Sequence, residues 1–402
     1  MLILLATLAC NAPEEVPTDA PTWTDDVAPL VVDHCATCHQ AGGIGVFPLT
    51  SYDDAKVVAA AMADAVSSRR MPPWSAEADC NRYEGDLSLS DEEIATITDW
   101  VEAGAPEGAS SAPLLAPAPQ VLQNPDLVLS MPELYTPSGE GGDDYRCFVV
   151  DWPYDDDVYV TAYDVQPGNT AVVHHLVAYI IDPEYADSYA GMDEDGAGYT
   201  CFGGPGGSAG NSARWLGAWA PGGDVNEMPE GVGIPVQGGS KIVLQMHYNT
   251  DAAGPQPDQT GMLLRVADTV DIPAEITPWA NPRWIGTQQM RIPAGESGVN
   301  HDFDYRLREG TTVYSVSLHM HRLGQSAGLT IHHSDASETC LLQIPEWDFN
   351  WQRSYRLAEP VVMEQGDVVN LSCNWDNPTD SDVFWGDGTN DEMCLSTMLV
   401  AY

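Results

Sequence analysis

Helical periodicity ends at a segment rich in alanine, proline and serine, residues 109–120, and this change of pattern constrains the fold more than any other feature. Before it, residues 23–108 have a helical pattern, in which Ser90 and Glu93 form a capping box ahead of apolar residues at helical spacing. This pattern predicts a helix of about 12 residues that ends near Gly104. Beyond the segment, which we interpret as an interdomain linker, helical periodicity is absent.

Short apolar alternations separated by Gly, Pro, Asn and Asp occupy the rest of the chain, and they predict antiparallel strands. The clearest of them begin at Val158, Val172, Lys241 and Thr312. About 280 residues are many for one sandwich, and a proline-rich break near 270–282 divides them. We therefore expect a multidomain chain in which a small all-α domain precedes two all-β antiparallel sandwich domains, at 121–272 and 273–402.

The N-terminus resembles a bacterial lipoprotein signal. Residues 1–9 are almost wholly apolar and Cys10 follows them, at the position where such a signal is cleaved and lipidated. No Lys or Arg precedes the apolar run, and the run is short, so a chance apolar N-terminus remains the alternative. We expect a signal at 1–10, a tether at 11–22, and an exported lipoprotein of a Gram-negative bacterium, periplasmic or at the outer membrane or cell surface. A lipid anchor would be its only membrane attachment.

The charge of the chain excludes one class of partner. With 15 basic and 60 acidic residues the formal net charge is -45, which repels phosphate backbones, so we expect no nucleic-acid partner. The chain also contains 44% hydrophobic residues and 12 Trp, which indicates packed domains despite the acidity.

Cysteines outside Cys10 and the CxxCH motif number six: Cys80, Cys147, Cys201, Cys340, Cys373 and Cys394. In an exported chain they are most simply three disulfides formed in an oxidising compartment, with about 15 possible pairings.

Cys35, Cys38 and His39 form a CxxCH motif, the attachment site of a covalently bound haem c with an axial imidazole. Met71, in a Pro-bounded loop, is the expected second axial ligand, with Met62 as its rival and core packing as the ordinary role of either. A zinc site would need His34 and Cys80 as further ligands, and a redox disulfide would need a βαβ setting. Residues 23–108 resemble small class I cytochrome c domains, with MPPW and AGAPEG similar to variants fused to larger bacterial oxidoreductases.

Several histidines in the strand-rich region have the spacing of metal ligands. His319 and His321 alternate, so both face one side of a strand, whereas His174 and His175 are adjacent and can share a metal only through a bend, a bulge or a linear geometry. Together with His247 and the thioether of Met393, they favour copper over hard cations. The other three, His301, His332 and His333, we expect to be ordinary core or surface residues.

Four segments, VVHHLVAY, LQMHYNT, SLHMHRLG and DEMC, match in order the copper type II, ascorbate-dependent monooxygenases, the group of peptidylglycine α-hydroxylating monooxygenase and dopamine β-monooxygenase. Residues 121–402 thus resemble this family, which implies two sequential β-sandwich domains that bind one copper ion each. The resemblance implies the ligands of an electron-supplying copper: His174, His175 and His247. It likewise implies the ligands of an oxygen-binding copper: His319, His321 and Met393.

The resemblance adds Gln245, two residues before His247, as a catalytic residue that assists electron delivery or water ordering. It also implies the disulfides Cys147–Cys201 and Cys373–Cys394. By elimination Cys80 could pair with Cys340, and two unpaired thiols are the alternative.

The implied function is a copper monooxygenase that hydroxylates an activated C–H bond of a small molecule with dioxygen. The fused CxxCH domain suggests that electrons arrive from an external donor through the haem rather than from ascorbate. A non-catalytic periplasmic electron-transfer or copper-binding lipoprotein is the alternative, and a structural surface protein is a third possibility. Peptide-amidating members have Arg and Tyr where this chain has Ser317 and Thr397, so we expect a neutral or cationic substrate other than a peptidylglycine.

Overall fold

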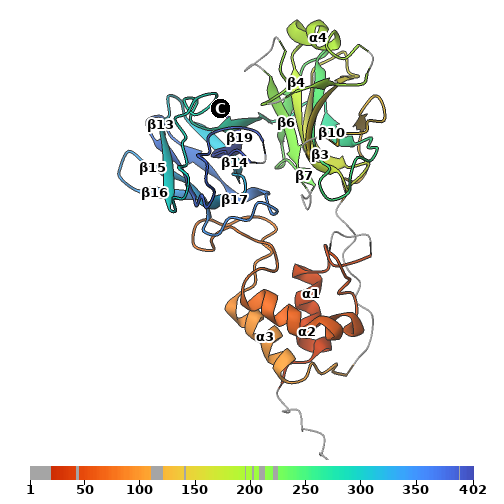
Figure 1. The fold of residues 1–402 in the computed structure, drawn as a ribbon, viewed down its shortest axis with the longest axis vertical. Coiled ribbons are helices and arrows are strands. Elements are labelled where there is room, and N and C mark those ends of the chain that lie inside the picture. Colours follow the sequence, from red (N-terminus) through yellow and green to blue (C-terminus); the bar gives the residue numbers. More distant parts are fainter. Residues whose placement is uncertain are drawn as a thin grey trace, which may run out of the picture. The chain divides into compact units, whose positions relative to one another are not determined.

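The computed structural model describes nine ranges of the chain: residues 20–41, 45–109, 121–139, 142–194, 196–201, 203–207, 213–220, 225–388 and 390–402. Cys10, the signal, most of the tether and nearly all of the 109–120 linker lie outside the described residues. The described chain forms two compact units, one within Met1–Trp74 and Leu87–Pro119 and the other within Ser75–Asp86 and Gln120–Tyr402 (Figure 1).

The first unit is helical. Its elements are a π-helical turn η1 (Trp23–Val27) and the helices α1 (Ala28–His34), α2 (Tyr52–Ser67) and α3 (Asp91–Glu102). The predicted capping box at the start of α3 is confirmed, since the Ser90 side chain accepts from the Glu93 amide and the Glu93 side chain accepts from the Ser90 amide. Gly104 follows the helix with a positive φ of 84°, a conformation that glycine adopts without strain. The core of the unit contains Trp23 and Trp100, whose ring centroids are 5.8 Å apart.

The second unit is built of strands, with one helix of eight residues, α4 (Pro183–Ala190), among its described residues, although the sequence predicts all-β domains here; the helix is too short to show helical periodicity. Its N-terminal half contains β1 (Leu127–Ser130), β2 (Asp143–Asp151), β3 (Val158–Gln166), β4 (Val173–Ile181), helix α4 (Pro183–Ala190), β5 (Tyr199–Thr200), β6 (Arg214–Trp219), β7 (Asn226–Glu227), β8 (Val232–Val236), β9 (Lys241–Asn249), β10 (Gly261–Ala267) and β11 (Ile272–Pro273). Its C-terminal half contains β12 (Glu275–Trp279), β13 (Val299–Arg306), β14 (Thr311–His319), β15 (Gly324–His332), β16 (Glu338–Ile344), β17 (Ser354–Met363), β18 (Val368–Trp375) and β19 (Leu395–Ala401).

Three sheets organise these strands. A nine-stranded sheet has the order β17-β14-β19-β12-β6-β4-β9-β2-β5, so it continues from one half into the other where β12 pairs with β6. A six-stranded sheet, β1-β10-β3-β8-β11 with β7 beside β3, belongs to the N-terminal half, and a four-stranded sheet, β13-β18-β15-β16, to the C-terminal half. Among the described strands every pair is antiparallel except β8 with β11. The four apolar alternations identified in the sequence are confirmed as strands β3, β4, β9 and β14.

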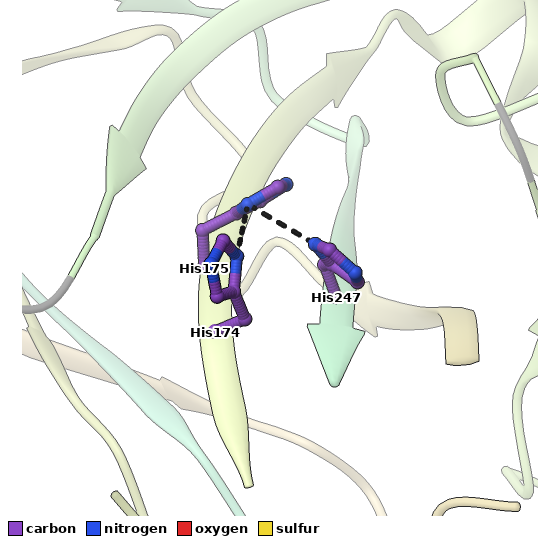
Figure 2. A group of neighbouring side chains, drawn as sticks. All are labelled: His174, His175 and His247. Atoms are coloured by element: carbon purple, nitrogen blue, oxygen red, sulfur yellow. Dashed lines mark hydrogen bonds between the residues drawn. The ribbon is translucent and has the colours of Figure 1, made fainter. Parts of the chain in front are cut away.

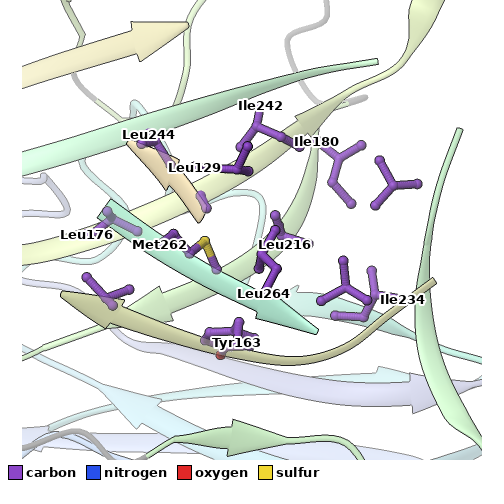
Figure 3. Close-up of a cluster of buried hydrophobic side chains, with 14 of the residues drawn as sticks. Leu129, Tyr163, Leu176, Ile180, Leu216, Ile234, Ile242, Leu244, Met262 and Leu264 are labelled. Carbon is purple, nitrogen blue, oxygen red and sulfur yellow. The ribbon is translucent and has the colours of Figure 1, made fainter. Parts of the chain in front are cut away.

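The core of the N-terminal half lies between its two sheets. Leu176 and Leu244 from the nine-stranded sheet and Ile234, Met262 and Leu264 from the six-stranded sheet are fully buried in one cluster (Figure 3). Alternate residues of each strand supply these side chains, because successive residues of a strand point to opposite faces. The other face of β4 and β9 lies outside this cluster. His175 in β4 and His247 in β9, which are register partners, lie on that face.

A strap formed by residues 75–86 packs on the C-terminal half, although the sequence predicts it within the helical domain at 23–108. Cys80 is bonded to Cys340, and Tyr83 forms an antiparallel bridge with Leu357 in β17. The Tyr83 hydroxyl donates to the Leu341 carbonyl at 2.9 Å. The strap thus pairs with β17, the edge strand of the nine-stranded sheet, and a local sequence pattern does not reveal this pairing.

Three disulfides are present: Cys80–Cys340, Cys147–Cys201 and Cys373–Cys394. The last two are the pairs that the family resemblance implies, and the first resolves the alternative that the sequence left open. No helix in the described part of the chain has the length and apolar character to cross a bilayer.

Candidate functional site

Three histidines converge where β4 and β9 lie side by side (Figure 2). The register pairs Val173 with Tyr248 and His175 with His247, so His174 is the extra residue of a β-bulge. The bulge turns two adjacent histidines toward one point, which is one of the three geometries that the sequence required of them.

The ring nitrogens of this first cluster are close together. His174 Nδ1 lies 3.2 Å from His175 Nδ1, which lies 3.4 Å from His247 Nδ1, and the candidate ligand atoms all fall within 4.8 Å of one another. The Nε2–H of His247 donates to Asp143 Oδ1 at 3.0 Å, which leaves its Nδ1 lone pair directed at the other two rings. The two Nδ1 contacts are drawn as hydrogen bonds in Figure 2, and with a metal ion bound the three Nδ1 atoms could instead all serve as ligands.

Burial favours the uncharged form of His174 and His175. Burial, with the neighbouring His247, lowers the pKa of His174 to about 4 and the pKa of His175 well below its usual value. Neutral imidazole is the form that binds a metal ion. Tyr145 also covers one face of the His247 ring, on which it stacks with centroids 4.2 Å apart.

A second pair of histidines lies at the end of β14. The rings of His319 and His321 are nearly perpendicular, with centroids 5.1 Å apart. The Nδ1–H of His319 donates to Gln352 Oε1 at 2.5 Å, and that of His321 donates to the Asp391 carbonyl at 3.0 Å. Both Nε2 atoms therefore remain available as ligands. Burial, with the adjacent imidazole of His321, lowers the pKa of His319 to about 3, and burial lowers that of His321 to about 4.

Met393 comes from the segment that precedes β19. The register pairs His319 with Leu395, two residues after Met393, and the Nδ1–H of His321 donates to the carbonyl of Asp391, two residues before it, so the methionine segment runs beside both histidines. The neighbouring Glu392 is fully buried, and its carboxylate accepts from the amides of His321 and Leu323 at 2.9 and 2.6 Å. This carboxylate thus fixes the backbone of the histidine segment against that of the methionine segment.

Gln245 lies on β9, two residues before His247, and is buried. Its Nε2 donates to the Gly204 carbonyl at 3.0 Å, and its Oε1 accepts from the Tyr179 hydroxyl at 3.3 Å. Cys147, the β2 residue paired with Gln245, is disulfide-bonded to Cys201, so the residue is held beside that bridge.

The CxxCH motif follows helix α1. The Nδ1–H of His39 donates to the Phe47 carbonyl at 2.9 Å, so its Nε2 is left as the axial donor that a haem would need. A Cβ on Gly45 would lie 2.7 Å from His39 Nδ1, so this close approach requires glycine. Met71 is half-buried outside the helices, whereas Met62 lies in the core of the helical unit. Cys80 is in a disulfide, which removes it from the ligands of a zinc site at this motif.

The other three histidines have protein partners. His301 Nε2 bonds the Arg291 carbonyl at 2.9 Å, and His332 lies 3.0 Å from Glu338. His333 bonds both Asp367 and Thr339. These contacts agree with the ordinary roles expected from the sequence.

Sequence reasoning missed the residues that orient the ligands. Asp143 and Gln352 each hold one histidine through its second nitrogen, yet both lie far from that histidine in the chain. Asp143 and Tyr145 do share a face of β2, because they are two residues apart in the strand. This alternation of a polar and an aromatic residue was the available sign in the sequence that the face borders a functional site.

Two family models match the chain. The N-terminal domain of the copper type II ascorbate-dependent monooxygenases matches residues 128–254, and the C-terminal domain of the same family matches residues 284–401. These two regions belong to the copper type II, ascorbate-dependent monooxygenase family. Both histidine clusters lie within the matched ranges, and the CxxCH motif lies outside them.

Relatives from animals share the same region. Peptidyl-glycine alpha-amidating monooxygenase A of Xenopus laevis is 29% identical over 267 residues, which cover 63% of this chain and 26% of the relative. Tyramine beta-hydroxylase of Caenorhabditis briggsae is 23% identical over 282 residues, which cover 63% of this chain and 44% of the relative. The chain thus spans less than half the length of these two monooxygenase relatives. A solved peptide-N(4)-(N-acetyl-β-D-glucosaminyl) asparagine amidase covers 68% of this chain and 95% of its own, at 9% identity and a TM-score of 0.32, a likeness too slight to carry an argument.

Proposed function

We propose that this chain is a copper-dependent monooxygenase that hydroxylates an activated C–H bond of a small molecule with dioxygen. One observation carries the proposal: the bulge at His174 brings three imidazoles together, in a chain that matches both domains of the family. The three rings come from two neighbouring strands, and their candidate ligand atoms all lie within 4.8 Å of one another, as a shared metal ion requires.

The residues fit two copper ions. His174, His175 and His247 would hold one ion through Nδ1, whereas His319 and His321 would use Nε2, with Met393 as a weak thioether ligand. Two cuprous ions supply together the two electrons consumed when one atom of dioxygen enters a C–H bond and the other becomes water. The protein orients the ligands through Asp143, Gln352 and the Asp391 carbonyl. Gln245, bonded to Tyr179, would assist from the first cluster.

The helical unit fits a covalently bound haem c. We propose Cys35 and Cys38 as its thioether attachments, His39 as one axial ligand and Met71 as the other. The orientation of His39 by Phe47 and the close approach of Gly45 support this assignment. The haem would pass single electrons from an external donor to the copper domains.

The substrate is proposed to be a small neutral or cationic molecule. At the two positions where amidating relatives carry Arg and Tyr, Ser317 and Thr397 form a register pair whose hydroxyls are 2.6 Å apart. They satisfy each other and offer no positive charge to a peptide carboxylate. The net charge of -45 further disfavours an anionic substrate.

We also propose that the chain is an exported lipoprotein anchored through Cys10. Three disulfides support an oxidising compartment, since such bonds are rare where thiols are kept reduced. We propose two copper domains at 121–272 and 273–402; β11 (Ile272–Pro273) spans this boundary and pairs with β8, and β12 pairs with β6 across it.

Metal analysis of the reconstituted protein tests the proposal. The wild type should hold one iron and two copper ions, and either His174→Ala/His175→Ala or His319→Ala/His321→Ala should remove one copper ion only. His332→Ala, which alters a histidine outside both clusters, should change nothing. A double variant that kept both copper ions would contradict the proposed ligands. A wild-type protein that bound no copper would contradict the proposal as a whole. If the copper-loaded protein formed no hydroxylated product from any candidate substrate, the result would favour the alternative, a non-catalytic electron-transfer or copper-binding lipoprotein.

The electron route has its own test. In stopped-flow mixing, a haem reduced beforehand should be reoxidised by the cupric protein, and Met71→Ala should change the haem spectrum while Met62→Leu should not. A haem that stays reduced beside cupric ions would refute delivery through the haem and leave the copper assignment intact.

A further inference from the structure

One aromatic ring contacts both proposed copper-ligand sets. Phe349 lies in the connection from β16 to β17, and its ring stacks on His174 with centroids 5.6 Å apart and planes inclined by 23°. The same ring meets His321 edge-on, with centroids 6.1 Å apart and planes inclined by 81°. Phe349 thus packs between one ligand of the first set and one ligand of the second.

The backbone of this connection is tied to the second set. Gln352 Nε2 donates to the Phe349 carbonyl at 2.9 Å, and Gln352 Oε1 accepts from His319. Upstream, Trp347 Nε1 donates to the His321 carbonyl at 3.1 Å. The connection is therefore held at both ends by the segment that carries His319 and His321, and the Phe349 ring reaches from it to the first set.

A charged group borders the same ring. The Arg322 guanidinium carbon lies 5.8 Å from the Phe349 ring centroid, within the range of a cation–π contact. Phe349 is half-buried, so part of its area is withdrawn from water by these neighbours. A large ring with two χ angles fills such a space at little entropic cost, which makes it an effective spacer.

We propose that Phe349 is a positioning residue that holds the two histidine sets at a fixed separation through its contacts with His174 and His321. The packing role depends only on the contacts above, whereas its importance for the enzyme rests on the proposed function. Since Phe349 touches a ligand from each set and binds no metal itself, it fixes their separation without contributing a donor atom.

Hydrogen exchange on the metal-free protein tests the packing. Phe349→Ala should speed amide exchange about tenfold at both 173–176 and 319–322, because the same ring restrains both segments. Phe303→Ala is the matched control: it removes a half-buried phenylalanine of the same sandwich that contacts Trp279 and Trp284 instead. Phe349→Tyr, which keeps an aromatic ring at this position, should show the same amide exchange at both segments as the wild type. Faster exchange at one segment only, or at neither, would overturn the proposal.

Dipolar EPR on the cupric protein tests the separation. Phe349→Ala should retain both copper ions and show a longer or broader copper–copper distance than the wild type, Phe303→Ala or Phe349→Tyr. An unchanged distance distribution in Phe349→Ala would overturn the proposed spacing role. If the wild type bound no copper, the monooxygenase proposal would fail, and the exchange experiment would still decide whether Phe349 joins the two sets.

Discussion

Tyr145 stacks on His247 with ring centroids 4.2 Å apart and planes inclined by 9°, and its hydroxyl donates to the Asp387 carbonyl at 2.7 Å. One side chain thus covers a proposed ligand of the first copper and also holds the segment that leads to Met393. The stacking and the hydrogen bond use different parts of the tyrosine, so they can be separated by mutation.

Tyr145→Phe should keep the copper affinity of the first site and lower the free energy of unfolding by about 1 kcal/mol, because only the hydrogen bond is lost. Tyr145→Ala should also weaken copper binding at that site, since the stacking is lost as well. Isothermal titration and urea unfolding give the two quantities. Tyr305→Phe, at an exposed tyrosine, serves as control, and equal copper loss in Tyr145→Phe and Tyr145→Ala would contradict this division of roles.

Asp143→Asn should weaken copper binding at the first site about 10–100-fold, because the carboxylate fixes the His247 tautomer from its Nε2 side. Asp144→Asn is a close control, since the adjacent carboxylate accepts from Tyr135 and Ser138 instead. Competition with a copper chelator measures both. If Asp144→Asn weakened copper binding as much as Asp143→Asn, the loss would come from a general disturbance of β2 and not from the lost hydrogen bond between Asp143 and His247.

The elements that local pattern determines were predictable from the sequence. The helix after Ser90 and the strands that carry the histidines follow from periodicity and capping, which involve residues close in the chain. The bulge at His174 was foreseen only as one of three geometries, because adjacent histidines require some distortion but do not specify which.

Contacts between residues that are far apart in the chain could not be predicted from local sequence patterns. The strap is an example: nothing within residues 75–86 specifies pairing with β17, and the register depends on Leu357 and Cys340. Gln352 and Phe349 are similar, because each acts on histidines that lie tens of residues away. The continuation of one sheet through β12 also depends on pairing between strands far apart in sequence.

Asp387→Asn should stabilise the protein above pH 6 and have little effect near pH 4. Burial, with the nearby charge of Asp391, raises the pKa of Asp387 from 3.8 to about 6. The folded state therefore binds this proton more tightly than the unfolded state, so stability falls as the pH rises from 3.8 to 6. After allowance for partial exposure, the gain at pH 7.5 should be about 1–2 kcal/mol. Thermal unfolding at both pH values measures it, with exposed Asp156→Asn as control, and an equal gain at pH 4 would exclude titration as the cause.

Cys80→Ser/Cys340→Ser should expose the strap to proteolysis while the rest of the β unit stays folded. The bond closes a loop with a sequence separation of 260 residues, and long loops are where a cross-link restricts the unfolded chain most. Without the bond, the strap is held mainly by backbone hydrogen bonds, among them Ala358 N–H to the Arg82 carbonyl at 2.9 Å, and by the buried Tyr83 ring. Such contacts open locally at modest cost.

Trypsin cleavage after Arg82 reports this opening directly, because the carbonyl of the scissile bond accepts the Ala358 hydrogen bond in the closed strap. We expect the wild type to resist cleavage there and the double variant to be cut several-fold faster, with cleavage after exposed Arg308 unchanged as an internal control. If Arg82 stayed protected in the double variant, the strand pairing and Tyr83 alone would be sufficient to hold the strap. The disulfide would then stabilise the protein only by lowering the conformational entropy of the unfolded chain, and would not be needed to keep the strap closed in the folded protein.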